Sequence, residues 1–220
     1  MTISVDAVVP DLEVEAWVRN ADMPQTFSLS DFRGQWLVLF FYPRDFTFIC
    51  PTEIAALAAL HPRFIEEDAV VLGASTDSFF CHKAWFETDH RLKDVNYPVI
   101  ADASHELTRT FGVLLPDGRA LRATFIIDPD GLLLHSSVTN HDAGRNIDEI
   151  LRVLQALKTG ALCPANWRPE RRLLRLPTLG ERFGSEDKNV EPLHAQKRRN
   201  HDHVYGPRPN QIERARPIVL

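Results

Sequence analysis

The residues of this chain that are best suited to do chemistry surround one cysteine, Cys50. The segment 43–49 leads into it, and the segment 51–53 follows it at once. If a helix begins here, its free N–H groups and the positive end of its dipole face the sulfur and favour the thiolate, which is the nucleophilic form of cysteine. The sequence therefore predicts a reactive thiol at this position, rather than the buried and inert cysteine that a lone thiol often is.

The elements that must position Cys50 are a strand, a loop and a helix. Residues 36–42 are apolar or aromatic throughout, which predicts a buried strand that ends at Pro43. From Pro51 onward the apolar residues recur at helical spacing, and proline fits the first helical position, where a missing N–H costs nothing. We therefore expect Cys50 at the N-cap of this helix.

The rest of the body alternates between strand and helix patterns. Residues 69–75 form a nearly continuous apolar run, which is typical of a buried parallel strand. The further elements that we expect are a helix at 78–90, a strand at 97–100, a helix at 104–111, a hairpin of strands at 122–128 and 132–138, and a helix at 145–158. This order predicts a thioredoxin-like α/β fold with a central mixed sheet flanked by helices.

The loop before the helix resembles a known active site. The spacing of Pro43, Thr47 and Cys50 is the signature of peroxiredoxins, and residues 41–53 resemble the alkyl-hydroperoxide-reductase (AhpC) branch of that family almost residue for residue. The resemblance covers about residues 3 to 169. It implies a thiol-specific peroxidase that reduces hydrogen peroxide and organic hydroperoxides to water and alcohols and protects against oxidative stress.

A second cysteine, Cys163, lies in a segment similar to the one that carries the resolving cysteine of typical two-cysteine members, with Leu162 in place of the family's valine. The resemblance implies that Cys50 becomes a sulfenic acid and then forms an intersubunit disulfide with Cys163. A dithiol donor, either thioredoxin or an AhpF-like or AhpD-like protein, would regenerate both thiols. The resemblance also implies a homodimer that assembles into a decamer, and no metal, flavin or haem cofactor.

Ionisation of the thiol is too small an effect to make a peroxidase. Full ionisation gains about 30-fold at pH 7, whereas enzymatic accelerations start at about 10⁶-fold. Donors must therefore face the oxygen that leaves. The resemblance assigns this role to Thr47 and Arg122, with Pro43 shielding the thiolate from water. It further indicates that Glu53 orients an arginine and that Arg145 lies near the site.

Several alternatives stay open at the level of sequence. Glu53 could be a solvated first-turn glutamate, and Arg145 a surface arginine at a helix start. We expect Cys81 to be a packing residue, and the segment 201–203 (His-Asp-His) to be too isolated to bind a metal. A redox-regulated holdase or chaperone is the alternative function. A thiol–disulfide exchange protein would need Cys-x-x-Cys, which the segment after Cys50 does not supply.

Composition and length set the remaining expectations. The chain has 220 residues and a net charge of -5, which does not favour nucleic-acid binding. We see no signal peptide and no membrane-spanning apolar run, and three cysteines are too few for a secreted disulfide scaffold, so we expect a cytoplasmic protein. Residues 1–168 should form the peroxiredoxin domain. Residues 169–220 should form a C-terminal extension that is extended or disordered over 178–220.

Overall fold

The computed structural model describes residues 3–175, which belong to two compact units that divide between Ile147 and Asp148. In the first unit the strands form one seven-stranded sheet of order β2-β1-β5-β4-β3-β6-β7. The strands are β1 Glu13–Trp17, β2 Gln25–Ser28, β3 Trp36–Phe41, β4 Ala69–Ser75, β5 Val99–Ala101, β6 Arg122–Ile127 and β7 Leu133–Thr139. The helices are α1 Cys50–Glu66, α2 Phe79–Thr88 and α3 Glu106–Thr110, with short 3-10 turns η1 Leu29–Phe32 and η2 His90–Leu92.

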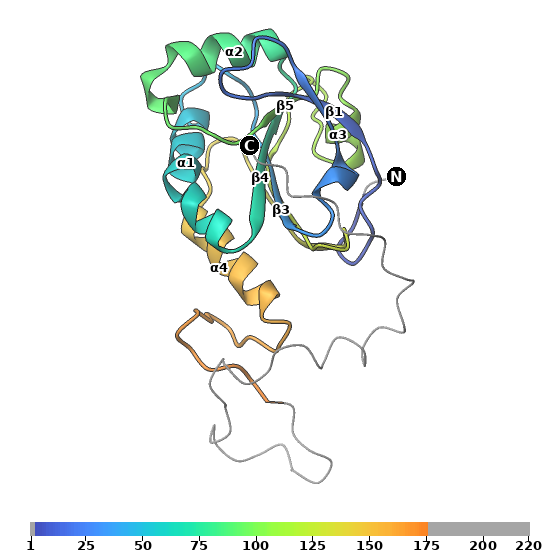
Figure 1. The fold of residues 1–220 in the computed structure, drawn as a ribbon, viewed down its shortest axis with the longest axis vertical. Coiled ribbons are helices and arrows are strands. Elements are labelled where there is room, and N and C mark those ends of the chain that lie inside the picture. Colours follow the sequence, from blue (N-terminus) through green and yellow to red (C-terminus); the bar gives the residue numbers. More distant parts are fainter. Residues whose placement is uncertain (1–2, 176–220) are drawn as a thin grey trace. The chain divides into compact units, whose positions relative to one another are not determined.

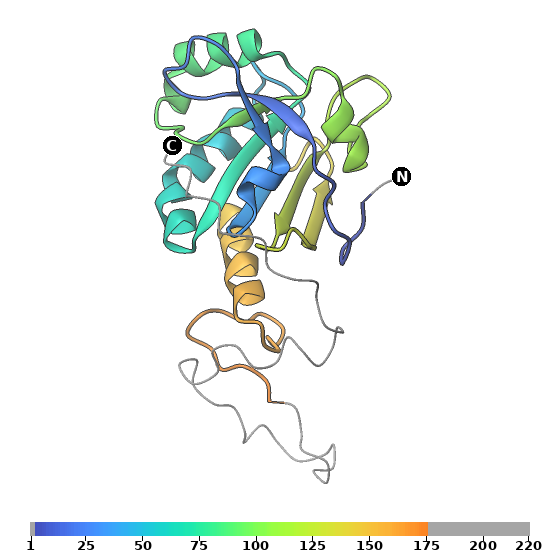
Figure 2. The ribbon, with the colours of Figure 1, turned by 45° about the vertical axis from the view of Figure 1, so that its right-hand side comes forward.

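The centre of the sheet is built from the most apolar strands. β3 and β4 pair in parallel, as do β4 and β5, while β6 pairs antiparallel to β3 and β7 antiparallel to β6. Figures 1 and 2 show α1 on one side of these strands and α3 on the other. Strands that are covered on both faces must be apolar on both faces, which explains the unbroken apolar runs.

Side-chain alternation decides which face each residue serves. One set of residues from β3 and β6 joins the core that also contains Leu107 of α3; this set is Leu37, Leu39, Phe41, Ala123, Phe125 and Ile127. Because successive side chains point to opposite faces of a strand, the intervening residues face the side of α1. Arg122 and Thr124 are among them, and both are buried. An arginine is thereby brought under the helix that Cys50 begins.

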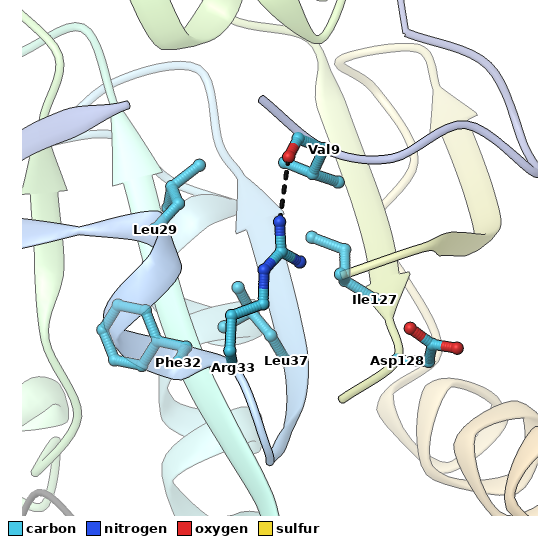
Figure 3. A pocket seen from close by; sticks show the side chains of 7 residues that line it. All are labelled: Val9, Leu29, Phe32, Arg33, Leu37, Ile127 and Asp128. Atoms are coloured by element: carbon cyan, nitrogen blue, oxygen red, sulfur yellow. Dashed lines mark hydrogen bonds between the residues drawn. The ribbon is translucent and has the colours of Figure 1, made fainter. Parts of the chain in front are cut away.

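The turn between β6 and β7 depends on a glycine next to Arg33, whose side chain Figure 3 shows. Gly131 has a φ of +83°, a conformation that L side chains rarely adopt. A Cβ there would also lie 0.8 Å from Nη1 of Arg33. Arg33 uses its Nη2 to donate a 3.1 Å hydrogen bond to the carbonyl of Val9, beside a cavity of about 10 Å³. The missing side chain therefore makes room for the guanidinium.

Most of the expected elements are confirmed, with differences of one or two residues at their ends. The strand at 69–75 is β4, and Ser78 caps α2 by accepting from the backbone N–H of Cys81 at 3.3 Å. At α1, however, Ile49 is the N-cap and Cys50 the first helical residue, so the helix begins one residue earlier than expected. Cys50 keeps its place at the positive end of the helix.

Two other helices, in contrast, begin later than expected, because tertiary contacts hold the preceding residues. The helix predicted at 104–111 begins at Glu106, after His105 adopts a left-handed φ of 62°. The carboxylate of Asp102 then accepts from the N–H groups of Leu107 and Thr108, at 3.1 and 2.8 Å.

The helix predicted at 145–158 is α4, Ile147–Lys158, with which the second unit begins. It does not include Arg145, whose backbone N–H is bonded to Glu53 instead.

Of the described helices, none combines the length and the apolar character that crossing a bilayer would take. The predictions for residues 178–220, including the 201–203 segment, lie outside the described residues, and the domain boundary expected at 168/169 stays a prediction.

Candidate active site

The sulfur of Cys50 lies against a guanidinium group. Cys50 is fully buried at the first position of α1, and Nη1 of Arg122 donates to its Sγ at 3.4 Å. These residues are 72 positions apart in the sequence, and the pairing of β3 with β6 brings them together. In that pairing Phe41 lies opposite Ala123, so that Arg122, the first residue of β6, reaches the end of β3 where the loop towards Cys50 starts.

Glu53, one turn into α1, joins two arginines. Its Oε2 accepts from Nη1 of Arg122 at 2.5 Å, and its Oε1 accepts from the backbone N–H and the Nε of Arg145 at 2.9 and 3.1 Å. The three side chains are at most 7% exposed. Two guanidinium charges against one carboxylate leave one positive charge in excess. This buried excess stabilises negative charge on the neighbouring sulfur or on an oxygen attached to it.

Arg145 is held as tightly as the groups that touch the sulfur. Its guanidinium donates to the carbonyls of Phe41 and Ala123, the paired residues at the ends of β3 and β6, and lies over the ring of Phe40 at 5.3 Å. Burial lowers the pKa of Arg145, while the charge of Glu53 raises it. An arginine stays cationic under such a shift. The interpretation of Arg145 as a surface residue at a helix start is therefore wrong.

Arg122 has one donor group to spare. Its Nε donates to the carbonyl of His141 at 2.9 Å, and its Nη1 serves Cys50 and Glu53. Among the described residues, no hydrogen-bond partner is found for its Nη2. The bonds of Nε and Nη1 hold the rest of the guanidinium in place. The part of His141 was not foreseen, because a backbone carbonyl leaves no mark in a sequence.

The loop residues Pro43 and Thr47 have no described contact with the sulfur of Cys50. Pro43 is buried, as a residue that shields the sulfur should be. The hydroxyl of Thr47 donates to the carbonyl of Arg44 at 2.9 Å. Its proton is thus engaged, and the oxygen can only accept from a further group. The expectation that Thr47 faces the thiolate or a peroxide stays a prediction.

The other two cysteines differ from Cys50 and from each other. All three are unpaired thiols. Cys163, in the second unit, is half-buried, with its Sγ 3.6 Å from the carbonyl of Ala156 and 3.5 Å from the hydroxyl of Thr159. Burial, followed by the charges of Asp45 and Asp77, raises the pKa of Cys81 to about 12. Cys81 is therefore a poor nucleophile, in agreement with the packing role expected for it.

Comparison with known proteins agrees with this site. The model of the AhpC/TSA family matches residues 5–136. The chain is 45% identical over 170 residues to the putative peroxiredoxin YkuU of Bacillus subtilis, covering 75% of this chain and 94% of that protein. It is 49% identical over 138 residues to alkyl hydroperoxide reductase C of Mycolicibacterium smegmatis, covering 63% of this chain and 71% of that protein.

A solved structure agrees as well. The structure of Mycobacterium tuberculosis AhpC superposes with a TM-score of 0.70 at 39% identity, covering 76% of this chain and 100% of that one. The thioredoxin-like α/β fold is thereby confirmed. Fold, buried cysteine and relatives together define a thiol-dependent peroxidase of the peroxiredoxin class. The chain belongs to the AhpC/TSA family.

Proposed function

We propose that Cys50 is the peroxidatic residue of this enzyme and that Arg122 stabilises its transition state. The thiolate of Cys50 attacks the terminal oxygen of a hydroperoxide. An S–O bond forms, the O–O bond breaks, and the departing alkoxide or hydroxide takes a proton from water. The products are a sulfenic acid and an alcohol or water. The observation that carries the proposal is the 3.4 Å contact of Arg122 Nη1 with Cys50 Sγ inside a cluster of excess positive charge.

The neighbouring groups have separate tasks in this scheme. The Nη2 of Arg122 donates to the leaving oxygen, where negative charge grows. Thr47, whose own proton is engaged, accepts the hydroperoxide O–H and so orients the peroxide. Pro43 keeps water away, and Glu53 with Arg145 fixes the plane of the guanidinium. Because these groups are bonded before the substrate arrives, no reorganisation is needed during the reaction.

Cys163 would complete the cycle as the resolving residue. Its thiol condenses with the sulfenic acid of Cys50 on the partner subunit, releasing water and forming an intersubunit disulfide. A dithiol reductant of the thioredoxin, AhpF-like or AhpD-like kind then reduces this disulfide by thiol–disulfide exchange. Both thiols are restored, and the reductant is itself oxidised to a disulfide. The partial exposure of Cys163 supports such an exchange. A cytoplasmic location also belongs to this proposal.

The assembly that we propose is a homodimer that forms a decamer. β7 is the last strand of the sheet, and the backbone N–H and C=O of Leu133 at its start are bonded to Ala7 and Asp6. The edge that follows Leu133 is the one that we propose pairs with another chain. Val138, on that strand, is 54% exposed. Analytical ultracentrifugation of the reduced and oxidised protein would measure the assembly, and a monomer in both states would refute this part.

Non-reducing electrophoresis after one equivalent of peroxide tests the chemistry. We expect a disulfide-linked dimer band that Cys50→Ser and Cys163→Ser each abolish. Cys81→Ser, the matched control, should leave it unchanged. A holdase without peroxidase activity would give no band and consume no peroxide, and a band that survives Cys163→Ser would remove the resolving role from this residue.

A further inference from the structure

A buried acid and a buried histidine connect the active-site loop to the rest of the fold. Asp45 lies in the loop between β3 and α1, two residues before Thr47. Its Oδ2 is 2.7 Å from Nδ1 of His82 in α2, and the two side chains are 1% and 0% exposed. The other carboxylate oxygen accepts from the hydroxyl of Tyr42 at 2.8 Å. None of the peroxide chemistry described above uses these groups.

The hydrogen bonds of His82 fix how many protons the pair holds. Its Nε2 is 3.1 Å from the carbonyl of Ile100, which can only accept, so this nitrogen carries a proton. Its Nδ1 faces the carboxylate of Asp45, and a hydrogen bond of 2.7 Å needs a second proton between them. The pair is therefore either an imidazolium with a carboxylate or a neutral imidazole with a carboxylic acid. In both forms it is neutral overall.

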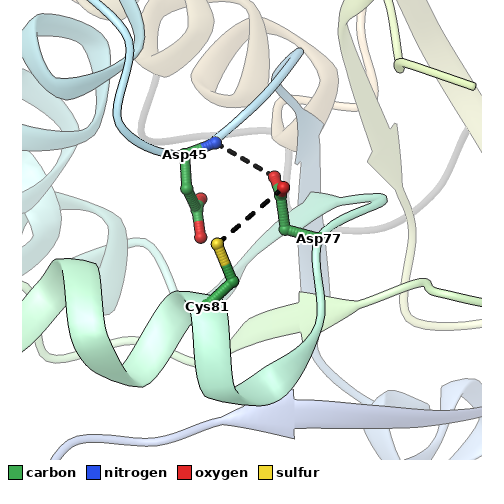
Figure 4. Close-up of side chains that lie close together, drawn as sticks. All are labelled: Asp45, Asp77 and Cys81. Carbon is green, nitrogen blue, oxygen red and sulfur yellow. Dashed lines mark hydrogen bonds between the residues drawn. The ribbon is translucent and has the colours of Figure 1, made fainter. Parts of the chain in front are cut away.

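The surrounding groups leave His82 as the counter-charge of Asp45. Burial raises the pKa of Tyr42 well above its usual range, so Tyr42 is neutral. Figure 4 shows Asp77 and Cys81 beside Asp45: Asp77 accepts from the backbone N–H of Asp45 at 3.0 Å, and Cys81, with its pKa of about 12, is a neutral thiol 4.0 Å from Asp77. Among the described groups that contact Asp45, His82 is the one that can be cationic.

We propose that Asp45 and His82 are a positioning pair for the peroxidase site. By sharing a proton they tie the loop 43–49 to α2 and, through Ile100, to β5. The loop is thereby fixed between the end of β3 and the start of α1, which sets the place of Thr47 relative to the sulfur. This inference rests on the function proposed above and concerns the rate at which the sulfur reacts, not the ability to react.

Charge compensation can be tested by rescue. As the imidazolium, His82 neutralises the carboxylate of Asp45, so His82→Leu leaves that carboxylate buried without a counter-charge and should lower the second-order rate constant for peroxide by about 10-fold or more. Asp45→Asn keeps every bond, because its amide N–H can donate to Nδ1 of a neutral His82 and its oxygen can accept from Tyr42; its rate should stay within about threefold of wild type. The double variant should react about fivefold or more faster than His82→Leu, since the unpaired charge is gone.

Limited trypsin digestion gives a readout that does not depend on catalysis. The Arg44–Asp45 bond lies in the loop, and Arg44 is exposed while Asp45 is buried. Cleavage after Arg44 should accelerate in His82→Leu and return towards the wild-type rate in the double variant. Should His82→Leu fail to fold, Asp45→Ala takes its place: it should react slower and be cut faster than Asp45→Asn.

The outcomes separate this inference from the proposed function. If the wild-type protein forms no disulfide with peroxide, the proposed function is wrong. The comparison of trypsin cleavage rates then tests the Asp45–His82 pair by itself. If wild type reacts but His82→Leu matches it, or the double variant is no faster than His82→Leu, the positioning pair is refuted. In the substitute experiment, equal rates and equal cleavage for Asp45→Ala and Asp45→Asn refute it as well.

Discussion

Replacing Arg122 by alanine separates two effects of its guanidinium. At 3.4 Å from the sulfur and an effective dielectric constant of about 20, the attraction between two unit charges is about 5 kcal/mol. Most of this acts on the thiolate in the ground state and does not lower the barrier. The part that raises the rate is the donation to the leaving oxygen, and one such donor is typically worth about 10²- to 10³-fold, or about 3 to 4 kcal/mol.

We therefore expect Arg122→Ala to lower the rate constant of peroxide reduction by about 10²-fold or more when the thiol is fully ionised. The assay is stopped-flow oxidation of the reduced protein, repeated at rising pH until the rate no longer increases. On that plateau the thiolate fraction is complete in both proteins. Alkylation of Cys50 by iodoacetamide serves as the comparison, because iodide needs no donor when it leaves; this rate should fall far less.

If the loss of rate in Arg122→Ala disappears on the plateau, the transition-state role of Arg122 is wrong. The guanidinium would then act through the amount of thiolate and not on the transition state. Arg145→Ala is the matched control, since Arg145 shares Glu53 with Arg122 but makes no bond to the sulfur. Arg145→Ala should loosen the hold of Glu53 on Arg122. It should lower the rate of peroxide reduction less than Arg122→Ala does.

Three further predictions concern stability. Glu53→Gln leaves two buried guanidinium groups without their carboxylate and should lower the unfolding free energy by about 3 kcal/mol or more. The control Glu149→Gln, at a half-exposed ion pair, should lower it by less than about 1 kcal/mol. Equal melting temperatures of the two variants would contradict this prediction. Gly131→Ala should destabilise more than Gly34→Ala in urea unfolding, because both have positive φ but only the first Cβ meets a guanidinium. The raised pKa of Cys81 means that the folded state holds this proton while the unfolded thiol ionises, so stability should fall as pH rises from about 9 towards 12, and Cys81→Ala should reduce that fall in pH-dependent denaturation.

Local features of the chain were predictable because they depend on neighbours in the sequence. The apolar run at 69–75 is β4, and the proline after Cys50 indicated the helix start to within one residue. The match of the segment around Cys50 to a family motif was specific enough to define the class of enzyme. The role of Glu53 as the partner of an arginine was also anticipated, with a solvated glutamate as the alternative.

Contacts between residues far apart in the chain could be found only in the folded structure. The register that sets Phe41 opposite Ala123 delivers Arg122 to the sulfur, and nothing in either strand alone specifies it. The same holds for Glu53 and Arg145, which are 92 positions apart.

The Asp45–His82 pair spans 37 positions and was not anticipated at all. Propensity and periodicity act over one or two turns, whereas a buried charge finds its partner only when the sheet and helices have closed around it.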